Sequence, residues 1–200
     1  MQPLKYAILH CLATREGREV TRDEVTMMHF GPARNKNGTY TYKSKVYKSI
    51  NLLPDEYIAR WHIRRLAAQY PGRGWSHFGY EKIQHLSGSW ETLVVNNNDN
   101  FVDPREVTNG ALGINGISRH FAYVGGCDVN MKPKDTRTPA QITSQILLVH
   151  EIISQHPNVQ WAGHNQFAAK ACPSFDVPKW LRSIGVAEKN ICQRPLMYKF

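Results

Sequence analysis

His164 and Cys172 are two soft metal ligands with seven residues between them, in the segment that runs from Gly163 to Asp176. A loop of that length can bring an imidazole nitrogen and a thiolate sulfur onto one Zn²⁺. Lys170 would then stand beside the metal. Catalytic zinc usually takes three protein ligands and leaves the fourth position to water. We therefore expect a third ligand from elsewhere in the chain.

His10 is the candidate for this third ligand. It follows the short apolar run Tyr6–Leu9, which predicts a buried strand, just as His164 follows a predicted strand at 158–163. Open α/β sheets place their sites in loops beyond strand ends. The alternative interpretation of a lone histidine at this position is a hydrogen-bonded core residue that binds no metal. With His10, His164 and Cys172 all expected in loops after strands, one shared zinc ion is the economical interpretation. Water on the fourth position, its pKa lowered toward ~7, would attack a carbonyl, which is the chemistry of hydrolysis.

The elements that must position these residues are marked by capping and periodicity. Thr21 with Glu24 three positions later forms a capping box and predicts a helix to about Phe30. Thr138, Pro139 and Gln141 predict the start of a second helix. Its apolar residues recur at helical spacing, and we expect this face to pack on the sheet: Ile142, Ile146, Val149, Ile152 and Ile153. A closing helix begins near Asp176 and ends at Gly185.

Further strands are expected after the glycine-rich loop that begins at Pro71, at 90–95 and at 120–124. Residues 31–58 interrupt this order. Their alternating stretch Thr39–Tyr47 predicts a polar hairpin or loop excursion, and we interpret residues 31–58 as an insertion. A solvated two-stranded flap is the favoured interpretation, and contact of its tyrosines and lysines with substrate is the alternative. The mixed order of strands and helices predicts an α/β fold.

Length and composition favour one domain over residues 1–200, since a domain typically holds ~100–200 residues. The net charge of +9 favours polyanionic partners, either nucleic acid or a cell-wall polymer. The basic residues are scattered and form no recognised nucleic-acid-binding motif, so nucleic acid is not expected. No apolar run approaches a membrane span, and the start of the chain lacks a signal peptide. We therefore expect synthesis in the cytoplasm. The cysteines Cys11 and Cys127 are expected to be buried and unpaired.

Five blocks occur in the same order as in a known family. The blocks are Ile8–Thr14, Gly72–Trp75 with Gly79–Tyr80, Asp135–Gln141, Gly163–Asn165 and Lys170–Asp176. Together they resemble the zinc-dependent N-acetylmuramoyl-L-alanine amidases of the phage-lysozyme and peptidoglycan-recognition-protein family. The resemblance runs from about residue 5 to residue 184 and implies a mixed central β-sheet flanked by helices.

The resemblance also implies the site. In that family the positions matching His10, His164 and Cys172 hold one zinc ion, and those matching Tyr80 and Lys170 assist catalysis. The substrate is the amide that joins the lactyl group of N-acetylmuramic acid to L-alanine of the stem peptide. By inference, Lys170 stabilises the developing oxyanion. Tyr80 orients or deprotonates the water, or adds a hydrogen bond to the oxyanion.

The chain departs from the family pattern at two positions. Relatives often have a histidine after the tyrosine, where this chain has Glu81, and phage relatives often have one near the position of Gly110. Asn109 and Glu81 are the candidates to replace them.

The leading hypothesis is a lytic or wall-remodelling peptidoglycan hydrolase that reaches the wall after release, in an endolysin-like manner. One alternative is a non-catalytic muropeptide-binding module of the same fold. A second is a cysteine amidase in which His164 is the base for a Cys172 nucleophile, and a third is a basic nucleic-acid-binding protein. The resemblance to family members that retain the zinc cysteine favours the enzyme.

Overall fold

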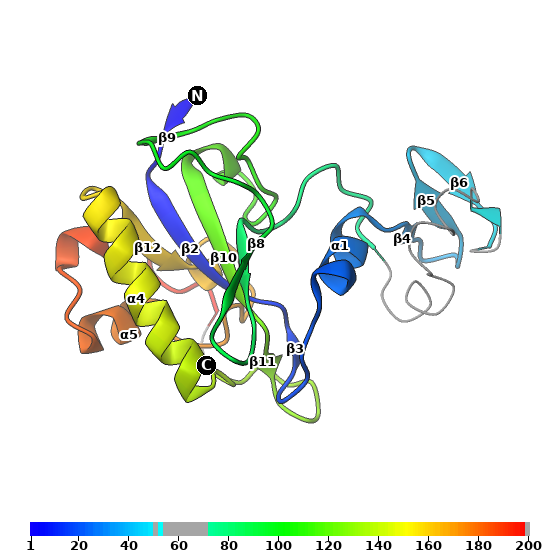
Figure 1. The fold of residues 1–200 in the computed structure, drawn as a ribbon. Coiled ribbons are helices and arrows are strands. Elements are labelled where there is room, and N and C mark those ends of the chain that lie inside the picture. The colour runs from blue at the N-terminus through cyan, green and yellow to red at the C-terminus, as the bar shows by residue number, and fades with distance from the viewer. Residues whose placement is uncertain (50–51, 54–71, 199–200) are drawn as a thin grey trace. The chain divides into compact units, whose positions relative to one another are not determined.

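The computed structural model describes residues 1–49, 52–53 and 72–198. Within it the chain divides into two compact units. We call Met1–Glu19 with Gly79–Phe200 the sheet unit, and Val20–Phe78 the helix–hairpin unit (Figure 1). The end of the predicted insertion, at 50–51 and 54–58, lies outside the described residues, as does Pro71. The interpretation of 1–200 as one domain stays a prediction.

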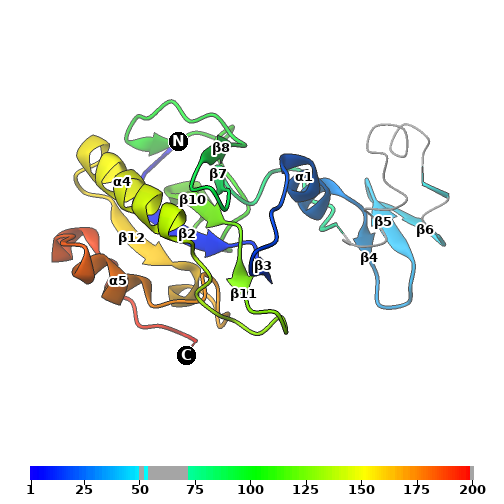
Figure 2. The same ribbon diagram turned by 60° about the horizontal axis from the view of Figure 1, so that its bottom comes forward.

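A five-stranded sheet forms the centre of the sheet unit, in the order β12-β2-β10-β7-β8. The strands are β12 (Gln160–Gly163), β2 (Tyr6–Cys11), β10 (Ser118–Tyr123), β7 (Lys82–Gln84) and β8 (Trp90–Thr92). The first four are parallel, and β8 pairs antiparallel with β7. Figure 2 shows β2 between its neighbours. The expected mixed sheet is confirmed, and β2 is an interior strand between β12 and β10.

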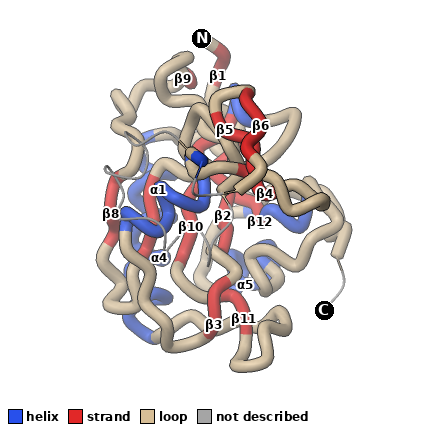
Figure 3. The backbone as a smooth tube through the Cα atoms, turned by 90° about the vertical axis from the view of Figure 1, so that its right-hand side faces the viewer, coloured by secondary structure: helices blue, strands red, loops and turns tan. Residues whose placement is uncertain are grey.

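Short two-stranded sheets accompany the five-stranded sheet. Strand β1 (Gln2–Pro3) pairs with β9 (Phe101–Val102), and β3 (Thr14–Arg15) pairs with β11 (Gly126–Cys127), which lie together in Figure 3. The loops of the sheet unit include the single-turn 3₁₀ helices η2 (Asn115–Ile117), η3 (His164–Gln166) and η4 (Glu188–Asn190).

The helix α4 (Pro139–Gln155) starts with the expected capping box of Thr138 and Gln141. The predicted apolar face is partly wrong, because the buried face is rotated toward Gln141 and Gln145, while Ile142 and Ile146 are only half-buried. Gln141 Nε2 donates to the Val124 carbonyl at 3.0 Å, so its amide is buried without losing hydrogen bonds. Hydrophobic periodicity cannot detect a buried glutamine that is satisfied in this way.

The two faces of the sheet bury different clusters. On one face, alternate residues of β2 such as Leu9 pack with Leu148 and Val149 of α4 and with Leu181 of α5 (Val177–Ser183), whose N-cap is Asp176. On the opposite face, Tyr6 and Ile8 pack with loop residues that include Ile114, Ile117 and Phe167. Because side chains alternate along a strand, His10 lies on the same face as Ile8 and away from α4.

In the helix–hairpin unit, α1 (Arg22–Phe30) has the predicted capping box. The predicted hairpin is also confirmed: β4 (Ala33–Arg34), β5 (Tyr40–Tyr42) and β6 (Lys45–Tyr47) form an antiparallel sheet. The ring of His29 stacks on Trp75, with centroids 5.3 Å apart. Burial, with a smaller contribution from the Arg73 charge, lowers the pKa of His29 to about 4.

Across the described residues, no helix has the length and apolar character needed to span a bilayer. All four cysteines are free, and Cys11 and Cys127 are buried as expected.

Candidate metal centre

Two of the three predicted metal ligands lie at the carboxyl ends of neighbouring parallel strands. His164 is the first residue after β12, as expected. His10 was expected in a loop, and this expectation is wrong, because β2 continues through Cys11 and His10 pairs with Ala122 of β10. A strand position restricts the His10 backbone more tightly than a loop does, which suits a ligand that must be fixed.

The structure brings His10, His164 and Cys172 together. One ligand atom from each lies within 4.8 Å of the others, and the Cys172 Sγ to His10 Nδ1 distance is 3.6 Å. Tetrahedral zinc with its usual bond lengths separates a sulfur and a nitrogen ligand by about 3.6 Å. The remaining separations are no more than 4.8 Å and would contract by up to about 1.5 Å on binding an ion. The three side chains therefore fit one tetrahedral ion with an open fourth position.

The protonation states of the cluster suit metal binding. Burial, followed by the charges of His164, His120 and Lys170, lowers the pKa of His10 well below its ordinary value, so this imidazole is neutral. Burial raises the pKa of the Cys172 thiol well above its ordinary value. A metal that binds this thiol must therefore displace its proton. Metal affinity should rise with pH for this reason.

The backbone of β2 supports the Cys172 sulfur. The Cys11 N–H donates to Cys172 Sγ at 3.3 Å. A backbone donor of this kind stabilises negative charge on a metal-bound thiolate and orients it.

The segment that carries His164 and Cys172 is held by buried polar groups. The side chain of Gln166 accepts from the Gly163 N–H at 3.0 Å and donates to the Cys192 carbonyl at 2.9 Å. Beside Cys172, the Tyr123 hydroxyl donates to the Pro173 carbonyl at 2.7 Å, and Ser174 Oγ donates to the Gly126 carbonyl at 2.8 Å. These bonds hold the segment at both of its ends, beside His164 and beside Cys172.

Tyr80 and Lys170, the two predicted catalytic residues, both lie near the cluster. The Tyr80 ring is 5.1 Å from the His10 ring, centroid to centroid. Lys170 is exposed and lies two residues before Cys172 in the chain, and its charge makes a small contribution to lowering the pKa of His10. Their catalytic roles stay predictions.

His120 also belongs to this group of residues, although the sequence marks it only as the start of a predicted strand. It is fully buried on β10, and its Nδ1 lies 3.0 Å from His10 Nε2. Burial, with a smaller contribution from His164, lowers its pKa to about 3, so it is neutral. The signal that would have found it is the two-residue period of a strand beside β2, combined with the parallel register.

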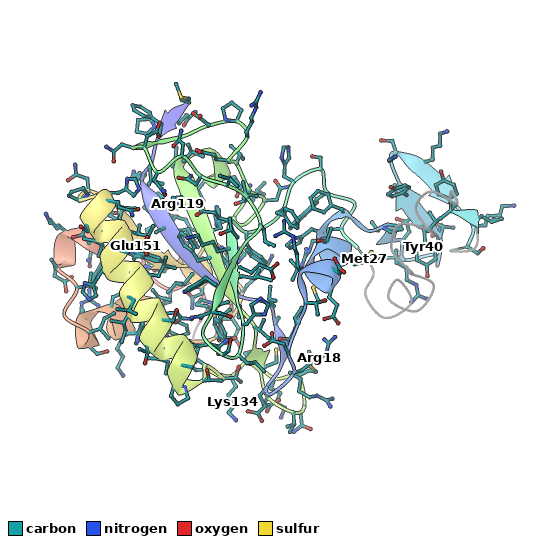
Figure 4. All side chains as sticks on the ribbon, viewed as in Figure 1. Arg18, Met27, Tyr40, Arg119, Lys134 and Glu151 are labelled. Atoms are coloured by element: carbon teal, nitrogen blue, oxygen red, sulfur yellow. The ribbon has the colours of Figure 1, made fainter. Side chains whose placement is uncertain are left out.

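Glu81 has a different role from the one that the departure from the family pattern suggested. Both of its carboxylate oxygens accept from Arg119, at 2.6 and 2.7 Å, and both side chains are buried (Arg119 is labelled in Figure 4). The guanidinium also lies 3.3 Å from His156 Nε2. Glu81 is therefore committed to a structural ion pair, and the substitution by Asn109 stays a prediction.

The helix–hairpin unit contains a pocket of about 680 Å³. Tyr42 and Lys43 of the hairpin line it together with Phe30, Trp75 and Phe78. Substrate contact by the tyrosines and lysines of the predicted insertion stays a prediction.

Comparison with known proteins identifies the family, although no family model matches the chain. The chain is 30% identical over 153 residues to the endolysin of Enterobacteria phage T3, covering 76% of this chain and 90% of that relative. The chain belongs to the phage endolysin family. It is also 30% identical over 118 residues to the endolysin of Escherichia phage T7, covering 59% of this chain and 73% of the relative.

Solved structures show which fold this endolysin family member adopts. The N-acetylmuramoyl-L-alanine amidase LysC from Clostridium intestinale URNW matches with a TM-score of 0.53 at 16% identity, covering 93% of this chain and 88% of the other. Bumblebee PGRP-SA matches with a TM-score of 0.52 at 16% identity, covering 98% and 87%. The predicted α/β fold and the resemblance to the amidase and peptidoglycan-recognition family are confirmed.

Proposed function

We propose that the chain is a zinc-dependent N-acetylmuramoyl-L-alanine amidase, which cleaves the amide between N-acetylmuramic acid and L-alanine of the stem peptide after release to the cell wall. The observation that carries the proposal is the convergence of His10, His164 and Cys172 around one tetrahedral position. Membership of the endolysin family supports action on peptidoglycan. The net charge of +9 suits an anionic wall polymer.

The donor set determines which metal fits. Two neutral imidazoles and one thiolate are ligands that zinc accepts readily, and three protein ligands are typical of a catalytic zinc site. A bound zinc ion supplies Lewis acidity toward the scissile carbonyl and lowers the pKa of water. The backbone N–H of Cys11 holds the thiolate, while the position of His10 within β2 keeps its imidazole fixed.

Lys170 and Tyr80 supply the remaining groups for amide hydrolysis. The exposed ammonium of Lys170 stabilises negative charge that develops on the carbonyl oxygen in the transition state. The Tyr80 ring lies beside His10, from where its hydroxyl can position water or donate to the same oxyanion. These roles need no further ionisable group in the cluster.

The raised pKa of Cys172 favours the metal enzyme over a cysteine amidase. A nucleophilic cysteine requires a lowered pKa, so that the thiolate exists at neutral pH. Burial raises the pKa of Cys172 instead, which disfavours a free thiolate, whereas a bound metal ion would displace the thiol proton.

The test uses purified sacculi incubated with the chain, with and without chelator. We expect new L-alanine amino termini, which chelator abolishes and zinc restores. No new termini with zinc present would refute the amidase, and retained binding to sacculi would then support the binding module. Cleavage that resists chelator would support the cysteine amidase.

Two serine variants test the ligand set. Cys172→Ser should lose most of its bound zinc and activity. Cys127→Ser replaces another buried free cysteine and should keep both. Full zinc content in Cys172→Ser would contradict the proposed ligands.

A further inference from the structure

The two nitrogens of His10 have different neighbours. Nδ1 lies 3.6 Å from Cys172 Sγ, and Nε2 lies 3.0 Å from His120 Nδ1. An imidazole that binds a metal through Nδ1 must carry its proton on Nε2, and that proton needs an acceptor. His120 Nδ1 is at hydrogen-bond distance in the position where this acceptor is required.

We infer that His120 is a positioning residue for the metal centre: its Nδ1 accepts from His10 Nε2–H and so holds the His10 Nδ1 lone pair toward the ion. This inference rests on the proposed zinc site. Metal-binding histidines usually donate this second proton to a carboxylate, a backbone carbonyl or water. Here a second, neutral imidazole on the neighbouring strand takes that part.

The backbone register fixes this pair. In the parallel pairing of β2 with β10, His10 is opposite Ala122, and His120 is opposite Ile8. The two histidines are therefore diagonal neighbours on one face of the sheet, with ring centroids 5.2 Å apart. Since both strands are central, neither backbone can shift without breaking the sheet pairing.

Gly110 provides an independent indication that the His120 ring has a fixed place. A Cβ on Gly110 would lie 2.3 Å from His120 Nδ1 and 2.4 Å from its Cγ. The loop backbone thus packs directly against the ring at the nitrogen that faces His10, and only glycine permits this approach. The loop closes over the acceptor and restricts rotation of the ring.

This orientation of the His120 ring leaves its other nitrogen, Nε2, without a hydrogen bond among the described residues. His120 Nε2 is buried and has no hydrogen-bond partner within the described part of the chain. A buried unsatisfied polar atom is unfavourable, and such atoms concentrate where function requires them. A residue selected only for packing would not need this nitrogen.

The experiment first measures zinc affinity by competition with a chromophoric chelator. His120→Leu removes the acceptor and should weaken zinc binding by about 10–100-fold, as removal of such partners typically does. His120→Asn places Oδ1 near the lost Nδ1 and should restore most of the affinity. Parent affinity in a folded His120→Leu, or an equal loss in both variants, would overturn the inference.

A pair of glycine variants tests the position of the ring without changing a polar group. Gly110→Ala should push His120 away from His10 and weaken zinc binding, because of the 2.3 Å contact. Gly116→Ala is the matched control, since a Cβ there meets nothing within 4 Å. Equal affinities for both variants would contradict the role of His120.

Nitrogen-15 NMR of the metal-free chain gives a readout that does not depend on the reaction. We expect His10 in the Nε2–H tautomer, and a mixed tautomer population in His120→Leu. An Nδ1–H tautomer of His10 in the parent would overturn the inference. A parent that shows the Nε2–H tautomer and binds zinc but releases no L-alanine termini would refute the amidase while leaving the role of His120 intact.

Discussion

Replacing Glu81 with glutamine removes one charge from an ion pair that is almost completely buried. The side chains of Glu81 and Arg119 are 4% and 3% exposed, and two hydrogen bonds of 2.6 and 2.7 Å join them. Removing one partner of such a pair typically costs about 3–5 kcal/mol, because the other charge stays buried without compensation. We expect Glu81→Gln to lower the free energy of unfolding by that amount.

This loss is large in relation to the whole stability. Domains are stable by about 5–15 kcal/mol, so the variant should unfold at clearly lower urea concentration than the parent. Far-UV circular dichroism during urea titration measures the change. A double variant, Glu81→Leu with Arg119→Met, removes both charges and should recover most of the stability, to within about 1–2 kcal/mol of the parent.

Zinc content distinguishes a structural role of Glu81 from a role in the metal centre. Glu81→Gln should bind zinc like the parent under conditions where it is folded, because its carboxylate is committed to Arg119. If the variant is as stable as the parent, the reasoning about the ion pair is wrong. If it is stable and loses zinc affinity, Glu81 serves the metal centre after all.

Two more outcomes follow from the electrostatics of single side chains. Lys170→Ala should keep zinc but hydrolyse substrate about 10²–10³-fold more slowly, the typical cost of removing one oxyanion donor. The control is Lys179→Ala, which removes another exposed lysine, on α5. An unchanged rate in Lys170→Ala would contradict the proposed role. The pKa of His29 is about 4 in the folded chain and 6.5 ordinarily, so the folded state binds fewer protons and stability falls as pH drops through this range. From about pH 7 to about pH 5 the parent should lose about 2 kcal/mol that His29→Gln does not lose, measured by urea unfolding; parallel pH profiles would contradict this assignment.

The sequence predicts the elements of this fold better than the orientation of their faces. Capping boxes locate the starts of α1 and α4 because they depend on residues three positions apart. The prediction of which α4 residues are buried was partly wrong. Gln145 is buried because it donates to the Gln84 side chain at 2.8 Å, between the helix and the sheet. A partner 61 positions away along the chain is not visible in a local pattern.

In the candidate site, too, local sequence patterns predicted some residues, whereas a contact between distant residues was missed. His164 and Cys172 are close in sequence, so their spacing alone suggested a metal. The position of His10 after an apolar run allowed it to be predicted as a ligand, although the strand in fact includes it. His120 was not recognised, because its contact with His10 depends on the register of two parallel strands, which hydrophobicity does not specify residue by residue.

The precision of the proposed metal centre depends on residues that carry no metal-binding signal. The residues directly after Cys172 are held by two hydroxyl groups: Tyr123 donates to the Pro173 carbonyl, and Ser174 donates to the Gly126 carbonyl of β11. Without these bonds the loop would be free to carry Cys172 Sγ away from its 3.6 Å approach to His10 Nδ1, which matches the separation of two ligands on a tetrahedral ion. The ligand types therefore determine which ion can bind, while the buried hydroxyl groups determine whether the three ligands meet at one point.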